Sequence, residues 1–345
     1  MTAYRRLILL ALALTTLVVV FGAYVRLSDA GLGCPDWPGC YGQLSPHHAA
    51  DEILQIHAAD PHGPVSLPKA WKEMIHRYLA ASLGLLIIAI AVIAWHQRTE
   101  PAAAPRVATA LVGLVIFQGL LGKWTVTLLL KPAIVTAHLL GGLATLALLV
   151  WLALRAHAAA RFDAPRGLIL AARAAFILLA AQILLGGWTS TNYAALACSD
   201  FPTCHGSLWP ATDYANAFHV VRELGMTADG DALTLAALTA IHWAHRLGAL
   251  LAGSALLALA IALACRHSTC IAGLALLAAL SLQIVLGIAN VVLSLPLPLA
   301  VAHNAGAAVL VGVMVWINYR LRGRRSPAVA TRRRAGNAGR ENSYA

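Results

Sequence analysis

The chain has 345 residues, of which 60% are hydrophobic and 11% are charged, and its formal net charge is +11. A composition this apolar excludes an ordinary soluble globular protein and is typical of an integral membrane protein. The basic residues lie mostly in short segments between apolar runs and in the C-terminal tail, so we predict no nucleic-acid partner.

The first apolar run follows Arg5 and Arg6 and resembles a signal peptide, but it lacks a clear small-x-small cleavage site. We therefore interpret it as a retained first helix. Seven further runs are also long enough to cross a bilayer, which takes roughly 20 residues. The predicted spans centre on Leu7–Tyr24, His76–Trp95, Val107–Leu128, Pro132–Leu154, Gly167–Trp188, Ile241–Ala264, Cys270–Val292 and Leu299–Tyr319.

The distribution of Lys and Arg predicts the orientation of these spans. With a cytoplasmic N-terminus, 17 of the 25 basic residues fall on the inner side, including eight arginines from Arg320 onward. Cytoplasmic loops carry such an excess. We therefore predict a multi-pass protein of the plasma (inner) membrane with both termini cytoplasmic, and with two long outer loops, 26–75 and 189–240, on the periplasmic side.

Each predicted outer loop begins with a pair of cysteines. Cys34 and Cys40 lie in "GLGCPDWPGC", and Cys198 and Cys204 lie in "ALACSDFPTC". The outer side is oxidising, and a short loop with Pro and Gly brings two cysteines within disulfide range, so we predict both disulfides. Each pair is either a structural staple or a redox-active thiol pair, whereas a metal site is disfavoured because no histidine partner is near. Cys265 and Cys270 fall on the inner side and are expected to be reduced.

The cysteine loops belong to a larger internal repeat. Cys34 aligns with Cys198 at an offset of 164 residues, Gln118 with Gln283 at 165, His138 with His303 at 165, and His76 with His245 at 169. Each copy has four spans, so the copies are parallel repeats. The expected fold is an all-α membrane protein whose eight transmembrane helices form two tandem four-helix bundles related by pseudo-twofold symmetry. The halves are 1–160 and 161–320, followed by a basic, disordered cytoplasmic tail, 321–345.

Four of the 14 histidines lie within apolar segments, at the duplicated positions His76, His138, His245 and His303. An ionisable residue in a span is costly and marks a functional site by default. All four lie at a similar depth near the outer side, two in each half. Two imidazoles facing each other across a bundle are what a six-coordinate haem iron requires. The alternative is that each histidine only hydrogen-bonds a neighbouring helix.

Charged residues flank the first histidine of each pair. Arg77 and Arg246 directly follow His76 and His245 and are candidates to pair with haem propionates, or else extend to lipid phosphate. Glu73 precedes His76 by three residues and shares its helix face, whereas His242 takes this position in the second half. Glu73 is a candidate catalytic proton acceptor. Its alternative is an interfacial ion pair with Lys69, Lys72 or Arg77.

These features together resemble the haem A synthase family of cytochrome oxidase assembly. The resemblance covers nearly the whole chain and rests on the duplicated eight-span plan, "CPDWPGC", "EMIHR", "TAHLLGG", "WAHRLG" and "VAHNAG". It implies an oxidoreductase that converts a haem O methyl group to formyl through a hydroxymethyl intermediate. It also implies that His76 and His138 bind the substrate iron, that His245 and His303 bind a permanent haem b, and that Glu73 is catalytic.

The expected partners are haem O, membrane lipid, an electron acceptor of unknown identity and, from the family alone, a haem O synthase. Assembly into a homo-oligomer stays open. Two other functions fit the sequence less well. A quinone-linked electron-transfer cytochrome with two haem b groups would use the same four histidines. A transporter with internal repeats would place its polar groups near the membrane midplane, whereas here they gather at the outer end.

Overall fold

The computed structural model describes residues 1–321, in which all regular secondary structure is helical. Eight helices are long and apolar enough to cross a membrane, which confirms an all-α, multi-pass membrane protein. They are α1 (Thr2–Leu27), α3 (Leu67–His96), α4 (Pro105–Thr127), α5 (Pro132–Ala156), α6 (Arg166–Thr191), α8 (Leu235–Ala264), α9 (Cys270–Val292) and α10 (Leu297–Arg320). The predicted disordered tail, apart from Leu321, lies outside the described residues.

Two helices begin earlier than predicted, and the loops before them are correspondingly shorter. Helix α3 starts at Leu67 rather than near His76, and α8 starts at Leu235 rather than near Ile241. The first turn of α3 carries Lys69, which does not read as membrane span, but proline near a helix start favours initiation there. The first turn of α8 is apolar, and the Thr234 side chain caps it by accepting a hydrogen bond from Ala237 N–H at 3.2 Å. The loops also contain two short helices that were not predicted, α2 (Ala50–Ala59) and α7 (Tyr214–Ala217).

The two halves end equivalent helices in the same way. Helix α4 is followed by Leu129 and Leu130, and α9 by Ser294 and Leu295, all four with positive φ. The second residue of each pair returns a backbone hydrogen bond to the preceding helix, from Leu130 to Thr125 at 2.9 Å and from Leu295 to Asn290 at 2.7 Å. Left-handed backbone is uncommon outside glycine, so its recurrence at an offset of 165 residues marks a shared turn geometry.

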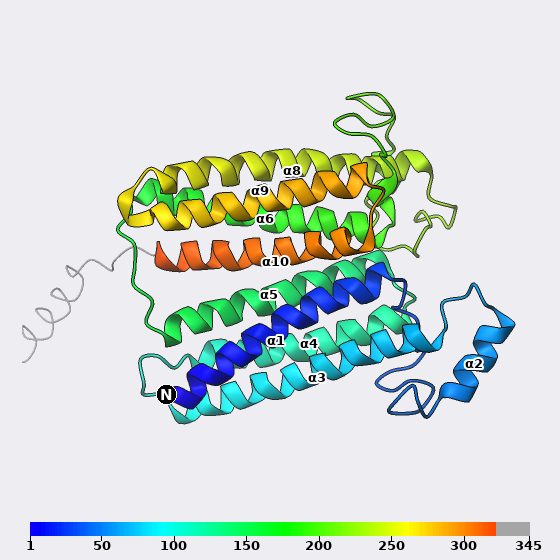
Figure 1. Ribbon diagram of the computed structural model, residues 1–345, viewed down its shortest axis with the longest axis horizontal. Helices are drawn as coiled ribbons and strands as arrows, with labels where there is room; N and C mark the ends of the chain where they lie inside the picture. Colours follow the sequence, from blue (N-terminus) through cyan, green and yellow to red (C-terminus); the bar gives the residue numbers. More distant parts are fainter. Residues whose placement is uncertain (322–345) are drawn as a thin grey trace, which may run out of the picture.

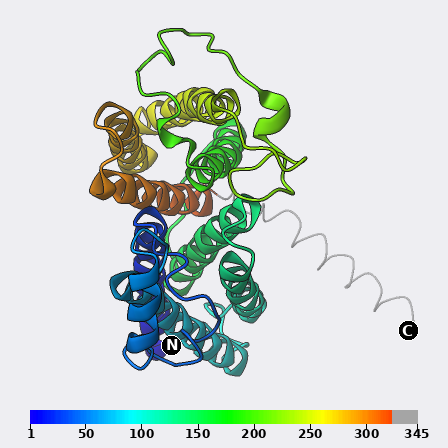
Figure 2. The same cartoon turned by 90° about the vertical axis from the view of Figure 1, so that its right-hand side faces the viewer.

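The helices pack in two groups of four (Figure 2). In the first group α1 contacts α3, α3 contacts α4, α4 contacts α5 and α5 contacts α1; in the second, α6, α8, α9 and α10 contact each other in the same cyclic order. Helices α1, α5, α6 and α10 also pack between the groups, where α5 contacts α10. Both cysteine loops lie at one end of the molecule, and the N-terminus and the end of α10 lie at the other (Figure 1).

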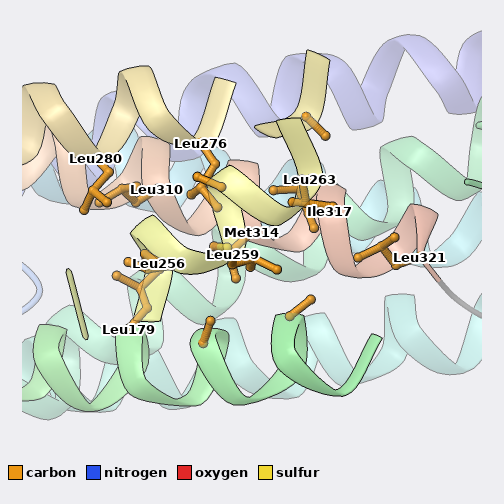
Figure 3. Close-up of a cluster of buried hydrophobic side chains, with 14 of the residues drawn as sticks. Leu179, Leu256, Leu259, Leu263, Leu276, Leu280, Leu310, Met314, Ile317 and Leu321 are labelled. Carbon is orange, nitrogen blue, oxygen red and sulfur yellow. The ribbon is translucent and has the colours of Figure 1, made fainter. Parts of the chain in front are cut away.

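Each group of helices contains a cluster of buried apolar side chains at the end away from the cysteine loops. The cluster in the second group is formed by the first half of α6, the last half of α8, the first half of α9 and the end of α10, and includes Leu256, Leu276 and Met314 (Figure 3). Its counterpart in the first group contains Ile8, Ile87 and Leu149. Dense apolar packing therefore occupies one end of each group and leaves the loop end for polar side chains.

Candidate functional site

The four span histidines lie on alternate long helices: His76 on α3, His138 on α5, His245 on α8 and His303 on α10. Within each group the two imidazoles are close enough to interact electrostatically, His76 with His138 and His245 with His303. The structure therefore brings together the two members of each predicted pair. In the described part of the chain, the Nδ1 atoms of His76, His138 and His303 are buried and have no hydrogen-bond partner.

A glycine of a neighbouring helix lies against each imidazole. A Cβ atom placed on Gly22 would lie 2.8 Å from Cε1 of His76, and one on Gly122 would lie 3.6 Å from Cε1 of His138. In the second group the corresponding distances are 3.0 Å from Gly186 to His245 and 3.1 Å from Gly287 to His303. A side chain at Gly22, Gly186 or Gly287 would displace the imidazole, so glycine at these positions allows the observed ring positions.

Glutamine side chains lie beside the histidines. Gln118 packs against Gly141, and Gln283 packs against Gly306, one turn after His138 and His303 respectively. The amide nitrogen of Gln283 lies 3.3 Å from Nε2 of His303. The nitrogen of Gln118 and the oxygen of Gln283 are buried without a partner among residues 1–321. Unpaired buried amides are expensive, so each of these atoms requires a partner such as an ordered water or a ligand group.

Glu73 is only 4% exposed and joins α3 to the first cysteine loop. Its carboxylate accepts the backbone N–H of Cys34 at 3.0 Å and the guanidinium of Arg77 at 2.5 Å. The ion pair with Arg77 that the sequence left open is therefore present. Arg77 also donates to the backbone carbonyls of Asp36, at 2.8 Å, and Gly39, so its guanidinium lies under the cysteine loop.

His242 takes the place of Glu73 in the second half. Its Nδ1 lies 3.2 Å from the backbone nitrogen of Cys198, and its Nε2 lies 3.2 Å from Nε of Arg246. Arg246 donates to the carbonyls of Thr203, at 2.8 Å, and Cys198, at 3.0 Å. A carboxylate accepts both contacts, whereas a neutral imidazole accepts at only one nitrogen, so the two anchors share a geometry but not a hydrogen-bonding capacity.

Both predicted disulfides are present. Cys34 and Cys40, and Cys198 and Cys204, are bonded with Cα–Cα distances of 4.8 Å in each pair. Cys265 and Cys270 are unbonded, as expected. In each loop an aspartate accepts two backbone N–H groups just after the second cysteine, Asp36 those of Tyr41 and Gly42 and Asp200 those of His205 and Gly206. Hydrogen bonds from Thr203 and Gly206 hold the pKa of Asp200 well below its ordinary value.

Sequence reasoning missed the glycines that face the imidazoles and gave the glutamines no role. The signal was present in the repeat, because Gly22 aligns with Gly186 and Gly122 with Gly287 at the same offsets as the cysteines and histidines. Glycine is common at helix contacts in membranes, so the alignment alone does not distinguish a glycine that leaves room for an imidazole from one that only lets two helices pack closely.

The residues of each group fit a haem. Each group holds two imidazoles near each other, the Nδ1 atoms of His76, His138 and His303 have no hydrogen-bond partner among residues 1–321, and a glycine of a neighbouring helix lies beside each ring. Neutral imidazoles in opposed pairs are the axial ligands of six-coordinate haem iron. Among residues 1–321, no group of three or more His, Cys, Asp or Glu side chains is arranged for a metal ion bound by protein alone.

Comparisons with known proteins agree with this chemistry. Residues 5–315 match the model of a family described as cytochrome oxidase assembly protein. A heme A synthase of Shewanella oneidensis is 43% identical over 91% of this chain and 95% of its own length. A heme A synthase of Sphingopyxis alaskensis is 32% identical over 92% of this chain and 91% of its own length. The chain therefore belongs to the COX15-CtaA family of cytochrome oxidase assembly proteins, the haem A synthase family that its motifs resemble.

Proposed function

We propose that this oxidoreductase oxidises a methyl group of haem O to a formyl group, through a hydroxymethyl intermediate. The observation that carries the proposal is the pair of neighbouring span histidines in each half, each beside a glycine, in a chain related to heme A synthases along nine-tenths of its length. Conversion of methyl to aldehyde with water as the oxygen source releases four protons and four electrons, so the substrate site needs an electron acceptor beside it. Haem b, when bound, accepts electrons one at a time.

We assign the substrate site to the half formed by residues 1–160. His76 and His138 would hold the iron of haem O, and Glu73 would accept protons released from the substrate methyl group. Glu73 is the carboxylate closest in sequence to a histidine pair, is almost fully buried, and is replaced by His242 in the other half. Its hydrogen bond to Cys34 also couples this carboxylate to the disulfide loop that covers the same end of the group.

We assign a permanent haem b to the half formed by residues 161–320, with His245 and His303 as ligands. Amide groups surround this pair: Gln182 and Gln283 contact the two imidazoles, and Asn304 follows His303. Arg77 and Arg246 were candidates for the propionates. Their guanidinium groups donate to the cysteine loops, so a propionate would share them with those carbonyls.

The two halves would be tandem four-helix bundles related by a pseudo-twofold axis. Support comes from the matching cyclic order of the helices in the two groups. The contacts between the groups also match, because a twofold axis that maps α1 onto α6 maps α10 onto α5, and both α1–α10 and α5–α6 contacts are present. We further propose that the cysteine loops and both haem sites face the periplasm and that both termini are cytoplasmic. The long loops lie at one end, and the N-terminus at the other, as this orientation requires (Figure 1).

Haem analysis of the purified protein tests this function. We expect haem b together with haem O, hydroxymethyl haem or haem A when haem O is supplied by co-expressed haem O synthase. A preparation that contains haem b alone under these conditions, and never produces haem A, would instead support an electron-transfer cytochrome with two haem b groups.

A further inference from the structure

The side chain of Gln182 on α6 contacts His245 in a way that has no counterpart at His76. Its amide nitrogen lies 3.0 Å from Nδ1 of His245 and 3.1 Å from the backbone oxygen of the same residue. His245 is thus the only one of the four span histidines, within residues 1–321, whose Nδ1 has a hydrogen-bond partner. Gln182 lies one helical turn before Gly186, so one face of α6 contacts the imidazole twice.

The structure provides a place for this amide on the opposite helix. Gly248, three residues after His245, has no side chain, and a Cβ atom there would collide with the amide oxygen of Gln182. In the first half the equivalent positions are Val18, at the offset of 164 residues, and Leu79, at the offset of 169 residues. The amide and the glycine that admits it are both absent there, and aliphatic residues stand at the two positions.

The contact with Gln182 affects how His245 would bind a metal. A histidine that binds metal through Nε2 carries its proton on Nδ1, and such an N–H is normally donated to an oxygen acceptor, which orients the ring and raises its basicity. A side-chain amide offers a donor on one side and an acceptor on the other. The amide oxygen of Gln182 is buried with no partner among the described residues. Rotation of the amide presents this acceptor to the Nδ1–H, in exchange for the present bond from the amide nitrogen to the backbone oxygen of His245.

We propose that Gln182 is a positioning residue that fixes the imidazole of His245 for haem b and makes this imidazole a stronger ligand than His76. This inference rests on the proposed assignment of haem b to the second half. A more basic axial ligand stabilises the ferric form, so the hydrogen bond lowers the reduction potential of the iron and strengthens retention of the haem. The first half, without such a contact, would hold its haem more loosely, which suits a substrate that must leave as product.

The test replaces Gln182 with methionine, which has a similar length and no hydrogen-bonding amide. In full-length purified protein, Gln182→Met is expected to raise the midpoint potential of haem b in a spectroscopic redox titration and to weaken haem retention about tenfold or more. Gln182→Glu supplies a stronger acceptor and is expected to keep the potential at or below that of the parent. Val18→Met, at the equivalent position of the first half, is the matched control and is expected to leave the haem b potential unchanged.

The readouts separate this inference from the proposed function. Purified parent protein that lacks a haem b spectrum with two histidine ligands would overturn the assignment of the site itself. If the parent shows that spectrum but Gln182→Met leaves both potential and retention unchanged, the positioning role of Gln182 is wrong. A potential that rises equally in Gln182→Met and Gln182→Glu would also contradict it, because the glutamate retains an acceptor.

Discussion

The two halves of this protein share a backbone plan and differ in what surrounds their histidines. Both set each imidazole against a glycine and both place a disulfide loop at the same end. The first half has aliphatic Val18 and Leu139 and the acidic Glu73, whereas the second half has Gln182, Asn304 and the imidazole of His242 at the equivalent positions.

On the proposed assignment, this difference separates the features that would hold an iron from those that would decide its chemistry. Two haem groups with two histidine ligands each would require the paired imidazoles that recur in both halves. On that assignment, the amide contact of Gln182 with His245 favours a haem that stays bound, whereas the aliphatic Val18 and Leu139 and the buried Glu73 suit a substrate that enters, reacts and leaves. The duplication therefore makes each half a control for the other.

Loss of a histidine ligand is expected to have the largest effect and to divide the halves most clearly. His303→Ala should lose the resident haem b, because one of its two iron ligands is removed, while His138→Ala should retain it and lose haem O binding. Visible spectra and haem extraction of the two purified variants measure this. Retention of the haem b spectrum in His303→Ala would place the ligand elsewhere.

Substitution of Glu73 tests whether its position does more than anchor the loop. Glu73→Ala should still bind haem, because both imidazoles remain, but haem A production should fall by about 100-fold or more if Glu73 is the proton acceptor. Glu73→His is the sharper variant, since it installs the residue that anchors the second loop through Cys198 and Arg246. Its loop should stay ordered while oxidation stalls.

Haem A formation in cells and limited proteolysis of the outer loop provide the two measurements. The reciprocal change, His242→Glu, is the control and should leave the haem b spectrum in place. Formation of haem A at the parental rate by Glu73→His would show that the position only holds the loop.

Methyl groups added at the glycines beside the imidazoles should have a smaller effect than loss of a histidine or of Glu73, because they shift a ring without removing it. Gly186→Ala places a Cβ atom 3.0 Å from Cε1 of His245, and such overpacking typically costs about 1–3 kcal/mol. We expect reduced haem b content and altered low-spin electron paramagnetic resonance signals. Gly253→Ala on α8, the helix that carries His245, where nothing lies within 4 Å of the added Cβ atom, should leave both unchanged. Equal effects of the two substitutions would contradict the role of Gly186.

The smallest expected effect concerns the second cysteine loop. Hydrogen bonds from Thr203 and Gly206 lower the pKa of Asp200, so its ionised form stabilises the folded loop above about pH 4, and this contribution is lost only as the pH falls through the lowered folded-state value. Asp200→Asn should increase proteolysis of the loop at neutral pH, whereas the parent loop should show constant protection between pH 5 and 8. Falling protection of the parent loop within that range would contradict this.

Much of this architecture was predictable from the sequence because membrane spans and repeats leave strong signals. Six of the eight spans begin within a few residues of their predicted start, and both disulfides form as expected. The start of α3 was placed too late because its first turn carries Lys69, which hydropathy counts as loop but a helix accepts. The first turn of α8 is apolar and was missed although its hydropathy is that of a span.

Side-chain contacts were harder to predict because they depend on rotamers and on neighbours far apart in sequence. Nothing in the sequence shows that Arg77 turns toward the carbonyls of its own loop, or that His242 anchors Cys198 as Glu73 anchors Cys34. The contact of Gln182 with His245 joins residues 63 positions apart, and it becomes visible only when α6 and α8 are packed together.

Haem stoichiometry in two double variants tests the central claim most directly. Purified His76→Ala/His138→Ala should contain haem b but neither haem O nor haem A, and purified His245→Ala/His303→Ala should contain no haem b. Such an outcome means that each half holds one iron porphyrin between its own two imidazoles. Loss of haem b from the first variant, with retention in the second, would contradict the assignment of the two sites.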